Sequence, residues 1–106
     1  MNAASSALRE RATLQRPDRA DDAIGGASLT WTDVAAVWAQ IESLGGGLRE
    51  AFDGAASTQR YAVTLRARDD VRADWRVIWN SRTLRVLSVA PAANARLVLA
   101  CEEERL

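Results

Sequence analysis

The sequence contains no histidine and no lysine, so all 14 of its basic residues are arginine. Nucleophilic catalysis normally needs a histidine or an activated lysine as base, and a zinc site needs several cysteine or histidine ligands. The single cysteine, Cys101, can form neither an intramolecular disulfide nor such a site, and it is expected to be a small buried hydrophobe. We therefore expect a protein that is not an enzyme and that uses no cofactor or metal.

Long apolar runs are also missing. No segment approaches the ~18 apolar residues that cross a bilayer, and Met1 to Arg11 lacks the apolar centre of a signal peptide. This predicts a cytoplasmic protein without a membrane partner. With 106 residues, of which 48% are hydrophobic, the chain is expected to fold as one domain over 1–106, with a flexible N-terminus at 1–10.

Motifs for chemistry are weak. Gly45-Gly46-Gly47 is not followed by the Lys-Ser/Thr pair of a phosphate-binding loop, and the acidic pairs lie in predicted turns or tails, where solvated charge is the usual explanation. Four tryptophans could stack nucleic-acid bases on one face, but all four fall within apolar patterns, which favours core packing. They are Trp31, Trp38, Trp75 and Trp79.

The net charge of zero is unevenly distributed. Residues 1–59 carry five Arg and eight Asp or Glu, residues 60–96 carry eight Arg and three Asp, and residues 97–106 carry one Arg and three Glu. A basic centre between acidic ends could let the positive face of one subunit meet the negative face of the next in a head-to-tail ring. A mixed, solvated surface explains the same pattern and is the favoured interpretation.

The first half of the chain is ambiguous. Arg11 to Arg16 alternates weakly and predicts an edge strand that Pro17 ends; a turn-rich loop over Asp18 to Ala27 follows, and then a short extended segment. In Asp33 to Leu44 the apolar residues fit an amphipathic helix narrowly better than a strand. Gly45 to Gln59 is expected to be a long loop that carries a short helical turn.

The second half alternates clearly. Tyr61, Val63, Leu65 and Ala67 share one face of a predicted strand whose other face is basic, and Trp75, Val77 and Trp79 share a face of the next. Asn80-Ser81 predicts a tight hairpin turn and Pro91 to Asn94 another. The strands over Thr83 to Val89 and Arg96 to Cys101 complete an antiparallel meander, the last with Leu97, Leu99 and Cys101 inward.

Taken in order, these segments resemble the head-tail joining family of tailed phages and phage-derived particles such as gene transfer agents, that is, the head-completion or stopper proteins. The resemblance covers nearly the whole chain. It is carried by Ala12-Thr13-Leu14-Gln15-Arg16-Pro17, Asp22, Gly25-Gly26, Thr30-Trp31, Asp33-Val34, Val37-Trp38-Ala39, Ile41, Thr64-Leu65-Arg66, Asp70-Val71, Arg76-Val77, Arg82, Val86 and Leu97-Val98-Leu99-Ala100-Cys101-Glu102. Leu84 and Asn80-Ser81 depart from the pattern, where the family often has an aromatic residue and a glycine turn.

The resemblance implies a mainly β fold, a small antiparallel β-barrel or sandwich of about six strands, and it favours strand over helix for Thr30 to Glu42. It also implies a structural connector or stopper. This would be a homo-oligomeric ring, expected to be a dodecamer, between the portal or adaptor and the tail terminator or another tail protein, with double-stranded DNA in its channel. The protein would then be cytoplasmic during assembly and lie in the neck of the finished particle.

The resemblance places a loop in the channel, formed here by Gly45, Gly46, Gly47, Leu48, Arg49, Glu50 and Phe52. Arg49, Arg60, Arg66 and Arg68 are the candidate contacts with DNA or a neighbouring subunit. The alternative function is a free-standing small-barrel module that binds single-stranded nucleic acid through tryptophan and arginine on one face.

Overall fold

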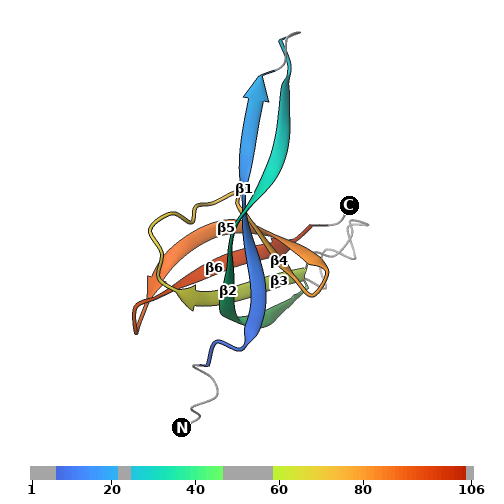
Figure 1. The fold of residues 1–106 in the computed structure, drawn as a ribbon. Coiled ribbons are helices and arrows are strands. Elements are labelled where there is room, and N and C mark those ends of the chain that lie inside the picture. Colours follow the sequence, from blue (N-terminus) through green and yellow to red (C-terminus); the bar gives the residue numbers. More distant parts are fainter. Residues whose placement is uncertain (1–6, 22–24, 47–58, 105–106) are drawn as a thin grey trace.

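The computed structural model describes residues 7–21, 25–46 and 59–104. Within them the chain is all strand, without a helix, and forms a closed barrel (Figure 1). The strands are β1 Glu10–Asp21, β2 Ala27–Gly46, β3 Gln59–Arg66, β4 Arg76–Trp79, β5 Arg82–Ala92 and β6 Arg96–Glu103. The predicted mainly β barrel is confirmed; the predicted helical turn in the long loop lies outside the described residues.

The order of strands around the barrel is β1-β2-β3-β6-β5-β4, and every pairing is antiparallel. Neighbours β4, β5 and β6 are the predicted meander. The barrel closes through a short pairing in which Thr13 to Gln15 of β1 meets Arg76 to Ile78 of β4. The expectation that β1 is an edge strand is therefore wrong in this part of the strand, where β1 is paired on both sides.

Alternating side chains from all six strands fill the interior. On β3, Tyr61, Val63 and Leu65 are buried while Arg60 and Arg66 are exposed, as the alternation predicts. Ala67, predicted to extend the inward row, is exposed because β3 ends at Arg66. The largest fully buried side chains are Leu14, Leu65, Leu84, Leu99, Val63, Val77, Val86 and Cys101.

The helical pattern of Asp33 to Leu44 is misleading, since all of these residues belong to β2. Ala39 is fully buried, whereas Trp38 and Leu44 are 53% and 57% exposed. Both β1 and β3 pair with β2, and these backbone ladders outweigh a local pattern that only narrowly favoured helix. The strand that the family resemblance implied here is confirmed.

Prolines do not end strands in this protein, contrary to expectation. β1 continues through Pro17 to Asp21, so the predicted loop over Asp18 to Ala27 is much shorter. Pro91 likewise lies inside β5, and the turn that follows is formed by Ala93 to Ala95. At both sites the strand is paired on one side, Pro17 with β2 and Pro91 with β6, and a proline without an N–H is tolerated at such an edge.

The hairpin turn predicted at Asn80-Ser81 is confirmed. It joins β4 to β5 between the paired residues Trp79 and Arg82. Both turn residues have positive φ, 53° and 62°, which is the backbone of a type I′ turn and matches the twist of the two strands.

Candidate functional site

A two-stranded arm leaves the barrel at the base of β1 and β2. Beyond Gln15, β1 pairs with β2 and with no other described strand, and β2 meets β3 only from Ala39 onward. We define the arm as residues 16–21 and 27–32. Figure 1 shows these segments rising well clear of the barrel. Six residues of extended chain reach ~20 Å, so the arm is long enough to touch a neighbouring molecule.

Polar contacts on one face stiffen the arm. The Thr32 hydroxyl donates a hydrogen bond to Asp18 Oδ2, and Arg16 forms an ion pair with Asp18 at 3.2 Å. Just below the arm, Gln15 Nε2 donates a hydrogen bond to Asp33 Oδ1 at 2.7 Å. The hydrogen bond from Thr32, followed by that from Arg16, lowers the pKa of Asp18 below its usual value. The carboxylate that holds the two strands together is thus ionised at neutral pH.

The other face of the arm forms a groove of about 520 Å³ with the barrel, here called the arm groove. At its centre, the Arg76 guanidinium lies 3.9 Å from the centre of the Trp31 ring, and its Nη2 is 2.8 Å from Glu104 Oε1. Arg76 Nε and Glu104 Oε1 are buried without a well-aligned hydrogen bond in the described part of the chain, so this contact is mainly ionic. The lining residues are Pro17, Arg19, Leu29, Trp31, Asp74, Arg76, Arg85 and Glu104.

A second groove of about 520 Å³ lies where β2 separates from β3, after their last paired residues Ala39 and Leu65. Beyond this pair, Trp38 and Arg66 border an open space. We call it the arginine groove. Its lining is Leu8, Val37, Trp38, Arg66, Ala67, Arg68 and Arg96.

The basic centre of the sequence is partly neutralised within the fold. Arg76 and Arg82 contact Glu104 and Glu103 of the acidic C-terminal segment. Arg85 contacts Asp74 at 2.8 Å, which raises the pKa of the arginine. Arg68 donates two hydrogen bonds of 2.9 Å to Asp70, and these lower the pKa of that carboxyl group. Part of the separation of charge along the sequence therefore becomes internal ion pairs.

The predicted site residues do not come together. Arg66 and Arg68 lie in the arginine groove, whereas Arg60 is at the opposite end of β3 beside Gly45. Gly45 and Gly46 are the last residues of β2, and Gly45 adopts a φ of 82°, which favours glycine. The remaining predicted loop residues, Gly47, Leu48, Arg49, Glu50 and Phe52, lie outside the described residues.

The sequence interpretation missed the aromatic part of the arginine groove and one of its arginines. Core packing is the expectation for Trp38, but the residue is 53% exposed and the Arg11 guanidinium lies 4.9 Å from the centre of its ring. Trp31 also lies outside the core, against Arg76. Trp75 is buried and Trp79 packs against the core, as predicted. Arg96 was not singled out because its partner strand, β3, is distant in the sequence.

The described residues offer no reactive cysteine, no cluster of metal ligands and no membrane-spanning helix that would indicate another site. Cys101 is buried, and burial raises the pKa of its thiol to about 12, so it is a poor nucleophile at neutral pH. Within the described ranges no cluster of potential metal ligands occurs. Among the same residues, no helix is long and apolar enough to cross a membrane.

Comparison with known proteins identifies the family. The profile of the phage head completion protein family matches residues 4–104. A chain from the virion of a native gene transfer agent particle has a TM-score of 0.76 and 23% identity, with 93% of this chain and 96% of that chain covered. The solution structure of a Shigella flexneri 2a protein has a TM-score of 0.69 and 28% identity, with 97% and 96% covered.

A search of curated proteins gives no match. The family profile nevertheless spans almost the whole chain, and both solved structures share its fold. This chain therefore belongs to the phage head completion protein family, and its role is structural, as the resemblance in its sequence indicated.

Proposed function

We propose that this protein is a head-tail connector of the stopper type. It forms a homo-oligomeric ring, a dodecamer, between the portal or adaptor and the tail terminator or another tail protein, and double-stranded DNA passes through the ring and is retained there. The subunit assembles in the cytoplasm and becomes part of the particle neck. Family membership and the barrel fold support this proposal.

The arm is the main observation that supports a ring. It extends ~20 Å from a barrel of its own chain, and the edge of β2 that faces away from β1 is unpaired from residue 27 to 38 among the described strands. Unpaired strand edges are templates for pairing with another chain. In a closed ring each arm would pair with the next subunit. Every unpaired strand edge would then have one partner, and no edge would be left over.

The predicted loop, which the structure shortens to the residues between Gly46 and Gln59, is the proposed channel element. β2 ends at Gly46 and β3 begins at Gln59, at the end of β2 opposite the arm. The two proposed contacts of a subunit, through the arm and through the loop, therefore begin at opposite ends of β2. In this proposal Arg49, within the loop, is the positive charge closest to the passing DNA.

Deleting Gly46 to Ser57 tests the loop. The deletion removes none of the buried residues of the described core, so we expect the barrel to fold with an unchanged far-ultraviolet circular dichroism spectrum. Particles that carry the variant should leak DNA or fail to join tails, which nuclease sensitivity and electron microscopy measure. Normal DNA-filled, tailed particles would show that the loop does not retain DNA.

A single-stranded nucleic-acid module is the second candidate, and the exposed ring of Trp38 beside Arg11 favours it. Titration with an oligothymidylate separates the two functions. A stacking module binds tightly as a monomer and its tryptophan fluorescence is quenched, whereas a connector subunit outside its ring binds weakly.

A further inference from the structure

We propose that the arginine groove is a binding site for the phosphate backbone of double-stranded DNA. The proposal rests on the connector function above for the identity of the DNA, and it goes further by assigning the contact to one end of the barrel. Arg66, Arg68 and Arg96 line the groove, and no carboxylate is among its lining residues, although Arg68 is also hydrogen-bonded to Asp70.

The backbone register forces two of these arginines together. Arg66 of β3 and Arg96 of β6 are direct cross-strand partners. Such partners have Cβ atoms ~5 Å apart, and like charges at this separation destabilise a sheet. Arg66 makes no ion pair within the described residues. An anion in the groove would relieve the repulsion, and phosphate accepts the forked hydrogen bonds that arginine donates.

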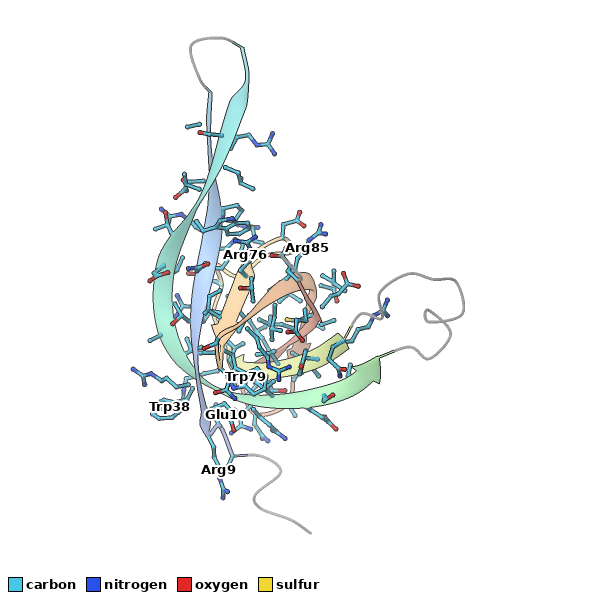
Figure 2. All side chains as sticks on the ribbon, turned by 90° about the vertical axis from the view of Figure 1, so that its right-hand side faces the viewer. Arg9, Glu10, Trp38, Arg76, Trp79 and Arg85 are labelled. Carbon is cyan, nitrogen blue, oxygen red and sulfur yellow. The ribbon has the colours of Figure 1, made fainter. Side chains whose placement is uncertain are left out.

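The positive surface continues past the groove. Arg11 stacks on the exposed ring of Trp38. Figure 2 shows that Arg9 and Trp38 lie at the end of the barrel away from Arg76 and Arg85. A ring and two more guanidinium groups beside a charged groove suit an extended polyanion with a sugar surface better than a small free ion.

A second copy of the chain is a poorer occupant. Five carboxylates of the described surface already have ion-pair partners: Asp18 contacts Arg16, Asp70 contacts Arg68, Asp74 contacts Arg85, Glu103 contacts Arg82 and Glu104 contacts Arg76. Inserting one of these into the groove would first break an existing ion pair. The DNA in the channel offers a continuous row of phosphates without that loss.

Arg66→Ala and Arg60→Ala form a matched pair for the test. Both residues are exposed on the outer face of β3, at its two ends, and each substitution removes one positive charge. Binding of the full chain to a fluorescein-labelled 20-base-pair duplex is measured by anisotropy at several salt concentrations. At 100 mM salt we expect Arg66→Ala to weaken binding about five- to tenfold and to reduce the salt slope by about one. Arg60→Ala should remain within about twofold of wild type at the same salt.

Thermal unfolding without DNA provides the folding control. Because Arg66→Ala removes the repulsion from Arg96, the variant should unfold at a temperature no lower than wild type, while its stabilisation by added duplex should be smaller. A loss of DNA affinity together with this unchanged stability supports the proposal.

Three outcomes would overturn it: equal weakening by both substitutions, which means diffuse attraction; no weakening by Arg66→Ala; or stronger binding of a polyglutamate peptide than of the duplex at equal charge, which means an acidic protein partner. Native mass spectrometry of the same samples separates this test from that of the connector. An intact ring with unaltered DNA binding by Arg66→Ala refutes the groove alone, whereas the absence of any ring from the wild-type protein refutes the connector.

Discussion

Two hairpin turns contain residues other than glycine in the left-handed region of backbone space. Asn80 and Ser81 have φ values of 53° and 62°, and Asn94 and Ala95 have values of 64° and 56°. Asparagine tolerates this conformation through local hydrogen bonding, but alanine gains nothing there and is strained by its Cβ atom. The turn between β5 and β6 therefore keeps its shape against a local preference.

Ala95→Gly is expected to stabilise the protein by about 0.5–1 kcal/mol, because glycine adopts positive φ without strain. Denaturant unfolding gives the free energy difference. Ala93→Gly is the matched control in the same turn. Ala93 does not have a positive φ, so glycine at this position should lower the stability of the protein. If both substitutions destabilise to the same degree, strain at Ala95 is not what limits this turn.

Strand β2 belongs to both the arm and the barrel. It pairs with β1 along the arm and base and with β3 at its other end, and it bulges at residues 43–45 as it approaches the loop. The arm is held against the barrel by Arg76, which reaches both Trp31 of the arm and Glu104 after β6. One β4 side chain thus links three parts of the chain.

Replacing Glu104 with glutamine should destabilise the protein by about 1–2 kcal/mol, because it leaves the half-buried Arg76 guanidinium without its counter-charge. Glu42→Gln is the control: Glu42 is exposed on β2 and has no described ion pair, so its effect should be within about 0.5 kcal/mol. Urea denaturation of the two variants compares them directly. Equal stabilities would mean that the ion pair does not hold the arm.

At the scale of the whole molecule, the barrel and the arm are separable. The buried core lies within the barrel, while the distal arm pairs only with itself among the described strands. An element of this kind contributes little to the stability of its own subunit. This is the geometry expected of a segment whose partner is another molecule.

Shortening the arm tests this separation. Replacing Asp18 to Thr30 with Asn-Gly keeps the paired residues Pro17 and Trp31 and joins them by a two-residue turn. We expect a folded barrel whose melting temperature changes by only a few degrees, about the effect of 1 kcal/mol in a domain of this size, and whose ring assembly is lost. Light scattering measures the mass of the assembly; a ring of wild-type mass would exclude the arm as the intersubunit contact.

The sequence alone determined the fold wherever a strand has one buried face. Tyr61, Val63 and Leu65 alternate with polar residues, and this period of two matches the pleat whatever the neighbouring strand is. The hairpin at Asn80-Ser81 was equally local, because its two residues suit the backbone of the turn. The identification of the family came from the same source, since an ordered succession of short motifs is a property of sequence.

The tertiary structure decided what depends on partners distant in the chain. The pattern of Asp33 to Leu44 fits a helix, and the segment is a strand because β1 and β3 pair with it. Pro17 does not end β1, because the strand has only one neighbour, β2, at that position. The grooves were hidden for the same reason: Arg66 faces Arg96, and Arg76 meets Trp31 and Glu104, through pairings of strands that no local pattern encodes. Periodicity specifies which face of a strand is buried, but only the closed ladder of hydrogen bonds specifies which residues of different strands are neighbours.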